Sequence, residues 1–171
     1  MLGFVGAAVA VGVGAYGSIH DPTGRSLVTL FFSSTINLKV WLATLAIALA
    51  GFQLASALRL YEVFGRGGAS DWLGIAHRIS GTGAFLLSLP VAYHCLWALG
   101  FNSGSGTRVL VHSVAGCLFY GAFAAKVFSV REHGFPSWVL PMVGGVTFTA
   151  LVAVWLTSSL WFFTNVEFPG F

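Results

Sequence analysis

Five long apolar runs dominate this sequence and leave few polar residues to form a soluble surface. Hydrophobic side chains make up 57% of the 171 residues, and charged side chains make up only 8%. Soluble domains carry roughly 25% charged residues, so this composition indicates an integral membrane protein. Because lipid offers the backbone no hydrogen bonds, each run is expected to be a helix. We therefore predict an all-α membrane bundle with five crossings at residues 3–17, 40–58, 73–100, 108–130 and 138–163.

The first run, residues 3–17, is short and rich in small side chains. Gly6, Ala10 and Gly14 recur every four residues, a spacing that lets another helix approach closely. A signal peptide is the alternative, but no Lys or Arg precedes the run, so we expect a retained extra helix beside a four-helix core. Residues 27–32 are too few to cross a membrane and are expected at its surface or as a dip into it. Residues 1–171 then form a single membrane domain.

The few positive charges predict orientation rather than nucleic-acid binding, because eight Lys and Arg residues form no basic stripe. Five of them fall on the side of the N-terminus and three on the other side, which favours a cytoplasmic N-terminus in a bacterial inner or plasma membrane. The first group is Arg59, Arg66, Arg78, Lys126 and Arg131, and the second is Arg25, Lys39 and Arg108.

Four of the five histidines lie within the third and fourth runs or shortly after them, and a polar turn at residues 102–107 joins these two runs. His94 lies six residues before the third run ends, and His112 lies four residues after the fourth begins. At ~1.5 Å per helical residue, both imidazoles lie roughly 6–9 Å below the same membrane face. His77 opens the third run and His133 follows the fourth, so an antiparallel hairpin brings this second pair together at the opposite face.

Histidines paired between apolar helices suit haem, whose iron accepts a neutral imidazole on each axial position. Ionisable groups within a span are costly and usually functional. We therefore expect His94 and His112 to ligate one haem b, and His77 and His133 are the candidate ligands of a second haem. Each histidine could instead bond a neighbouring carbonyl, and His133 could be a loop residue. No Cys-x-x-Cys-His segment occurs, so the haem would be held non-covalently.

Two cations and one methionine complete the candidate site residues. Lys126 and Arg78 are candidate partners for a haem propionate or a quinone oxygen, with snorkelling of Lys126 to the headgroups as the alternative. Pro90 lies one turn before His94 and predicts a kink that re-aims this histidine. Met142 is an axial ligand in principle, although a lone methionine in an apolar helix usually packs.

Histidines paired across neighbouring apolar helices near both faces resemble the b-type membrane cytochromes, among them quinol-linked and ferric-reductase-like proteins. The segments 77–81, 90–94 and 112–116 are also similar to an uncharacterised family of small bacterial multi-helix membrane proteins. This resemblance covers about residues 18–163. It implies one or two b haems and electron transfer, although familiar two-haem cytochromes space histidines on one helix by about four turns, against 17 and 21 residues here.

Three function classes follow from these patterns. The leading hypothesis is an electron-transfer subunit rather than a stand-alone enzyme, with other membrane subunits of a redox complex or the quinone pool as its partners within the lipid bilayer. The alternative is a cofactor-free, or chlorophyll-ligating, accessory subunit of a respiratory or photosynthetic complex. A proton or solute carrier is less favoured, because the spans contain no Asp or Glu relay and no inverted repeat.

Overall fold

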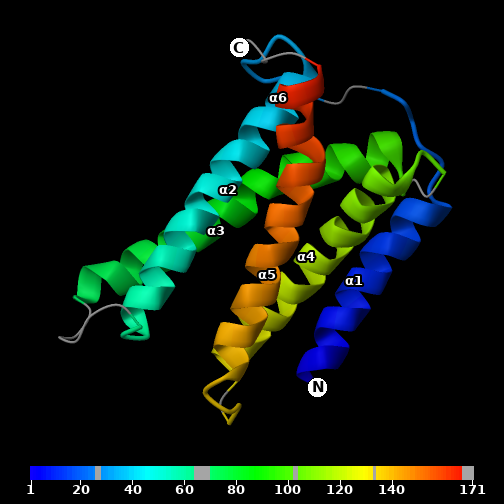
Figure 1. Cartoon of the computed structure of the whole chain (residues 1–171). Coiled ribbons are helices and arrows are strands. Elements are labelled where there is room, and N and C mark those ends of the chain that lie inside the picture. The colour runs from blue at the N-terminus through cyan, green and yellow to red at the C-terminus, as the bar shows by residue number, and fades with distance from the viewer. Residues whose placement is uncertain (26–27, 64–69, 102–103, 133, 167–171) are drawn as a thin grey trace.

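The computed structural model describes residues 1–25, 28–63, 70–101, 104–132 and 134–166. These residues form helices and connecting turns without any β-strand, and five of the helical units are long and apolar enough to cross a membrane. The predicted all-α bundle is therefore confirmed (Figure 1). The helices are α1 (Leu2–Ile19), α2 (Thr35–Leu60), α3 (Asp71–His94), α4 (Thr107–Arg131), α5 (Val139–Trp155) and α6 (Trp161–Asn165).

Two short π-helical segments extend the crossings that carry α3 and α5. The segment η1 (Cys95–Leu99) follows α3 directly, and η2 (Leu156–Leu160) joins α5 to α6. A π turn closes hydrogen bonds five residues apart instead of four, and such turns are frequently found at functional sites. The sequence patterns predicted helix in both places but not this change of helix type.

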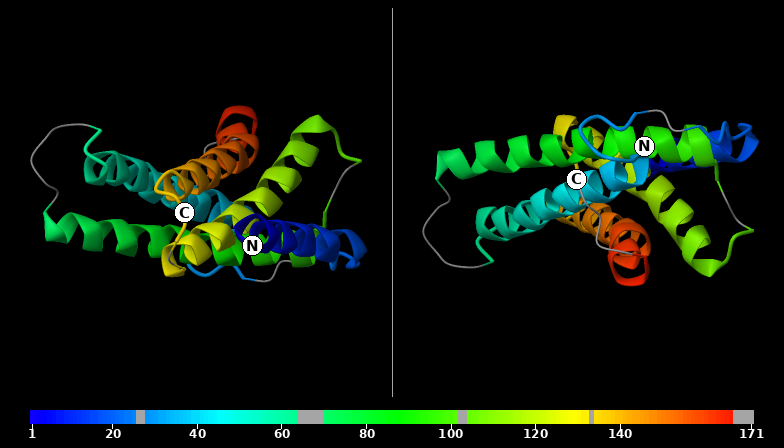
Figure 2. Two further views of the ribbon diagram at one scale, coloured as in Figure 1. Left: turned by 90° about the horizontal axis from the view of Figure 1, so that it is seen from below. Right: turned by 90° about the horizontal axis from the view of Figure 1, so that it is seen from above.

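The five crossings pack mainly as neighbouring pairs, with α2 against α3, α4 against α5, and α1 on the outside of α4 (Figure 1). The indole of Trp155 on α5 donates to the Thr44 hydroxyl of α2 at 3.1 Å, which joins the two pairs on one side. On the other side, the rings of Phe85 and Phe123 stack at 4.1 Å between α3 and α4. Beyond these contacts α3 and α4 diverge toward the ends that face residues 100–107 (Figure 2).

The stripe of small residues predicted on α1 packs directly against the backbone of α4. A Cβ atom placed on Gly121 of α4 would lie 2.4 Å from the carbonyl oxygen of Gly6 and 2.8 Å from the Cβ of Ala10. A Cβ on Gly14 would lie 3.4 Å from the sulfur of Cys117. Helix packing in lipid depends on such close van der Waals contact, so this stripe places the N-terminal helix beside the core.

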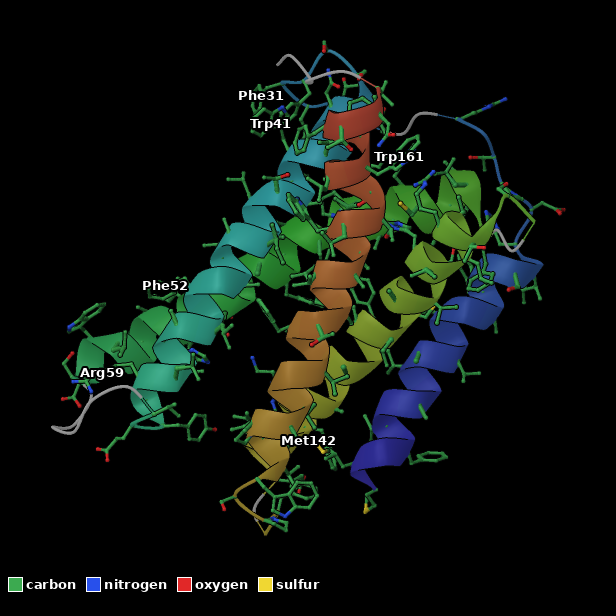
Figure 3. All side chains as sticks on the ribbon, viewed as in Figure 1. Phe31, Trp41, Phe52, Arg59, Met142 and Trp161 are labelled. Atoms are coloured by element: carbon green, nitrogen blue, oxygen red, sulfur yellow. The ribbon has the colours of Figure 1, made fainter. Side chains whose placement is uncertain are left out.

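Many large apolar side chains are exposed on the outside of the bundle, as a lipid-facing surface requires (Figure 3). Residues 28–34 form turns rather than a helix, and within them the Phe31 side chain is 96% exposed. The buried core is small and centres on Ala50, Phe119, Ala150 and Leu151, where α2, α4 and α5 meet.

Candidate functional site

A cavity of about 470 Å³ lies among α2, α3, α4 and the α5–α6 crossing, where α3 and α4 diverge. Pockets for small molecules and cofactors usually measure ~300–1,000 Å³, so this cavity has the size of a ligand site. Apolar side chains form most of its wall, and polar groups come from all four crossings. The polar groups that bear on function are Lys39, Ser88, Arg108, His112 and Thr157.

The imidazole of His112 lines this cavity, and its orientation is set by Thr157 of η2. Nδ1 of His112 lies 3.1 Å from the Thr157 hydroxyl oxygen, and that hydroxyl lies 2.6 Å from the carbonyl of Ala153. Because the single hydroxyl proton is donated to Ala153, the oxygen accepts a hydrogen bond from Nδ1–H of His112. The neutral imidazole therefore keeps its free lone pair on Nε2, the nitrogen that a metal ion would need.

Thr157 also holds a cation at the cavity. Its backbone carbonyl, within the π segment η2, accepts a hydrogen bond of 2.6 Å from Nη1 of Arg108. The Arg108 guanidinium in turn lies 3.9 Å from the ring centroid of Trp161, in a cation–π contact. Arg108 and His112 are four residues apart on α4, so one residue of the neighbouring crossing orients both.

The other π segment, η1, is hydrogen-bonded to the chain segment that connects α1 with α2. The carbonyls of Trp97 and Ala98 accept hydrogen bonds from the backbone N–H groups of Thr23 at 3.2 Å and Gly24 at 3.1 Å. The ring of His20 stacks on Trp97, with centroids 4.6 Å apart. His20 is thus a contact residue of this connection.

His94 lies beside the cavity rather than in its wall. The neighbouring Ala92 and Cys95 line the cavity, whereas the His94 ring does not. Its side chain is only 9% exposed, and Nδ1 has no hydrogen-bond partner among the described residues. A buried polar atom without a partner costs ~1–3 kcal/mol, so His94 is a side chain that a further group would stabilise. The structure therefore places the predicted pair at one end of the bundle, with only His112 facing the cavity.

A second polar cluster surrounds His77, near the other end of α3. Its Nδ1 lies 2.8 Å from the hydroxyl of Ser56 on α2, and that hydroxyl is 2.7 Å from the carbonyl of Phe52. By the same reasoning as for His112, Nδ1–H of His77 donates and Nε2 retains its lone pair. The His133 position lies outside the described residues, so the predicted His77–His133 pair does too.

Lys126 belongs to this second cluster through Gln53 of α2. The Lys126 ammonium donates to the Gln53 side-chain oxygen at 3.3 Å, and the Gln53 amide nitrogen donates to Ser80 at 2.8 Å and to the carbonyl of His77. Lys126 thus turns inward toward α2 and α3 instead of extending to the headgroups. No described Asp or Glu forms an ion pair with it.

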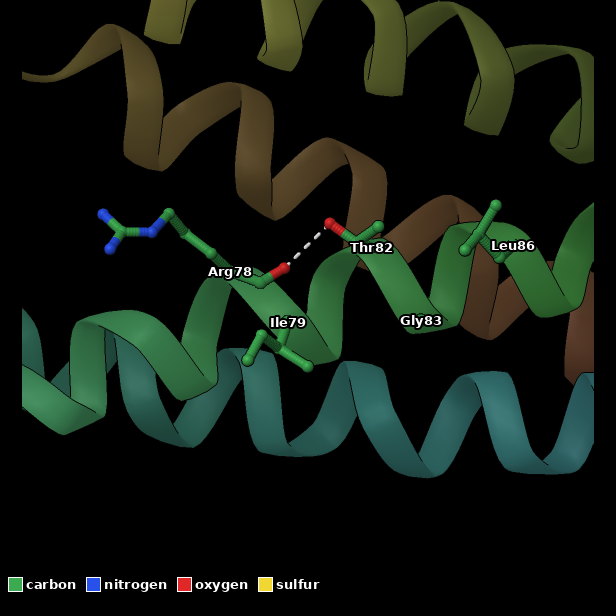
Figure 4. A pocket seen from close by; sticks show the side chains of 5 residues that line it. All are labelled: Arg78, Ile79, Thr82, Gly83 and Leu86. Carbon is green, nitrogen blue, oxygen red and sulfur yellow. Dashed lines mark hydrogen bonds between the residues drawn. The ribbon is translucent and has the colours of Figure 1, made fainter.

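Two other candidates lie away from the cavity. Arg78 is exposed on the outer face of α3 (Figure 4), and Met142 is 51% exposed near the start of α5 (Figure 3).

Conversely, the sequence patterns did not single out Lys39, Arg108 and Thr157 as site residues. The first two were visible only as loop-flanking charges, and nothing local distinguishes Thr157 from other threonines in apolar runs.

The described residues contain no group of three or more His, Cys, Asp or Glu side chains that could hold a metal ion by themselves. Iron at this cavity would therefore depend on a macrocycle for most of its coordination, with imidazole only at axial positions.

These features define the class of the protein: an all-helical chain whose five long helices are apolar enough to span a membrane and enclose a cavity with a histidine in its wall. The chain belongs to the DUF6529 family, a family of unknown function whose profile matches residues 1–170. No curated protein and no solved structure matches the chain. The resemblance to an uncharacterised family is thus confirmed at this coarse level, and the resemblance to b-type cytochromes stays a hypothesis.

Proposed function

We propose that this protein is a b-type membrane cytochrome that relays single electrons through a haem bound in the cavity between α3 and α4. The observation that carries the proposal is the His112 imidazole, which lines the cavity and whose Nδ1 lies 3.1 Å from the Thr157 hydroxyl. Metal-ligating histidines have this arrangement, because a hydrogen bond at one ring nitrogen orients the ring and raises the basicity of the other.

The positively charged side chains that line the cavity favour a ligand that carries carboxylates. Lys39 and Arg108 line it, and no Asp or Glu does so among the described residues. Uncompensated charges are costly in apolar surroundings, and a carboxylate beside an Arg or Lys forms a strong charge-assisted hydrogen bond. The two propionates of haem b supply this chemistry, so Lys39 and Arg108 are the residues we assign to them.

His94 is the residue we assign as the second axial ligand. It is buried next to two residues of the cavity wall, and its Nδ1 lacks a partner. Ligation by His94 requires its ring to face the cavity.

A bound haem would supply the one-electron couple, and the chain would supply orientation and shelter from water. His112 and His94 would be the residues that hold the iron, and Thr157 would fix the His112 ring. The electron donor and acceptor would be other membrane subunits of a redox complex or the quinone pool. The cluster of His77, Gln53 and Lys126 is the candidate site for a quinone oxygen, or for a second haem in which His133 takes part.

The decisive experiment is a dithionite-reduced minus oxidised spectrum of the protein purified after haem-replete expression, with a pyridine haemochrome assay for stoichiometry. We expect a Soret band and at least one haem b per chain, lost or shifted in His112→Ala and retained in the control His20→Ala. A wild-type protein without a Soret band would reject the cytochrome and favour the accessory subunit, and a chlorin spectrum would favour its chlorophyll-ligating form.

A further inference from the structure

The outer face of α3 carries a groove that the proposed electron transfer does not use. Five residues along one face of the helix line it: Arg78, Ile79, Thr82, Gly83 and Leu86 (Figure 4). The groove has a volume of about 360 Å³. The eight helical steps from Arg78 to Leu86 correspond to ~12 Å along the helix.

The groove is apolar along its length and cationic at one end. Ile79 is 67% exposed and Leu86 is 56% exposed, and the smaller Thr82 and Gly83 between them leave the depression. The hydroxyl of Thr82 is occupied by a hydrogen bond of 3.0 Å to the carbonyl of Arg78. Thr82 therefore presents mainly its methyl group to a neighbouring molecule.

Arg78 marks the cationic end. Its side chain extends along α3 toward the N-terminal end of the helix (Figure 4), and it forms no ion pair with the described carboxylates. Arg78 is seven residues after Asp71, so its Cα lies roughly 10 Å from the start of α3. A guanidinium at this depth reaches the headgroup region by extending toward the helix end.

The geometry points to a binding site for one anionic phospholipid, whose phosphate pairs with Arg78 and whose acyl chain lies along Ile79, Gly83 and Leu86. Charge complementarity favours this occupant, because the unpaired guanidinium requires an anion at the headgroup level and the groove beneath it requires a hydrocarbon. A partner helix would have to bring a carboxylate to the same depth in the membrane, which is costly. In the predicted orientation Arg78 faces the cytoplasmic leaflet, where anionic lipids are found.

Native mass spectrometry of the full chain in detergent, titrated with phosphatidylglycerol or phosphatidylcholine, tests this site. We expect preferential retention of one phosphatidylglycerol, and a loss of roughly tenfold in its affinity for Arg78→Gln, as the removal of one charge-assisted hydrogen bond predicts. Arg78→Lys should retain part of the preference, because an ammonium still pairs with a phosphate. Thr82→Phe fills the groove without changing charge and should weaken binding of the lipid as well.

Arg131→Gln is the matched control, because Arg131 is another exposed cation, at the last residue of α4. Equal retention of the two lipids by the wild-type protein would overturn the proposal, as would an equal loss in Arg78→Gln and Arg131→Gln. A membrane protein that copurifies with the wild type but not with Arg78→Gln or Thr82→Phe, while lipid retention stays unchanged, would instead identify the groove as a helix-docking site. These readouts do not involve haem.

Discussion

The hydroxyl of Thr157 on η2 accepts a hydrogen bond of 3.1 Å from Nδ1 of His112 on α4, and the carbonyl of the same threonine accepts one from Arg108. One residue thus sets the tautomer of a histidine and the position of a cation four residues before it. Both groups line the same cavity, so a single contact between α4 and the α5–α6 crossing orients two groups of different chemistry.

Thr157→Val should lower haem affinity by ~10–100-fold, the usual effect of removing the hydrogen bond that orients a metal-bound histidine. The valine retains the side-chain shape but cannot accept the proton of Nδ1. Thr157→Ser is the matched control and should bind haem as the wild type does. The measurement is the rate of haem transfer to apomyoglobin. Equal rates for the Thr157→Val and Thr157→Ser variants would contradict the role of Thr157 in orienting His112.

His112→Ala should convert the haem from low-spin to high-spin and allow carbon monoxide to bind. In the proposed site two imidazoles would ligate the iron, and removing one would open a position for a diatomic ligand. Electron paramagnetic resonance and carbon monoxide difference spectra measure these changes. Lys126→Gln should leave the spin state intact, because Lys126 bonds Gln53 in the other cluster. A protein whose haem survives both His94→Ala and His112→Ala but is lost in His77→Ala would place the haem at the other end of α3.

The double variant Lys39→Gln with Arg108→Gln should weaken haem binding, whereas binding of haem dimethyl ester should change little. The ester has no carboxylates, so only haem b itself would lose charge-assisted hydrogen bonds, each ~1.5–3 kcal/mol. Titration of the apoprotein with both forms separates this electrostatic effect from general loss of structure. An equal weakening for both forms would show that the two cations act on folding rather than on propionates.

Gly121→Ala should destabilise the contact between α1 and α4 by ~1–3 kcal/mol, the typical cost of overpacking. The added Cβ would lie 2.4 Å from the backbone oxygen of Gly6, which cannot move without shifting the helix. Gly12→Ala on α1 is the control, because its Cβ would meet nothing within 4 Å. Thermal unfolding in one detergent compares the two, and equal melting temperatures would contradict this packing.

Membrane orientation can be tested by cysteine labelling in a background without Cys95 and Cys117. We expect a cysteine at Ser70 to react with an impermeant maleimide only from the cytoplasm, and one at Ser105 only from outside, because five crossings place these connections on opposite faces. The reverse pattern would invert the predicted topology. Labelling of both from one side would contradict the arrangement of α3 as a crossing.

The apolar runs were enough to predict five helices, because a backbone surrounded by lipid must satisfy its hydrogen bonds locally and the length of a run sets the length of its helix. The stripe of Gly6, Ala10 and Gly14 was also visible in the sequence, because the spacing of small residues on one helix face is a local property. The depth predicted for His94 and His112 came from counting residues along each run and stays a prediction.

Only the tertiary structure decided which way these histidines face and what surrounds them. The π segments take part in long-range contacts, Trp97 and Ala98 with residues 23–24 and Thr157 with Arg108, and these partners are distant in the sequence. The cavity arises where α3 and α4 diverge, which depends on how pairs of helices pack. His112 lies within the regular helix α4, and His94 ends α3 directly before η1, so only the packing of the folded chain showed that His112 lines the cavity and that His94 lies beside it.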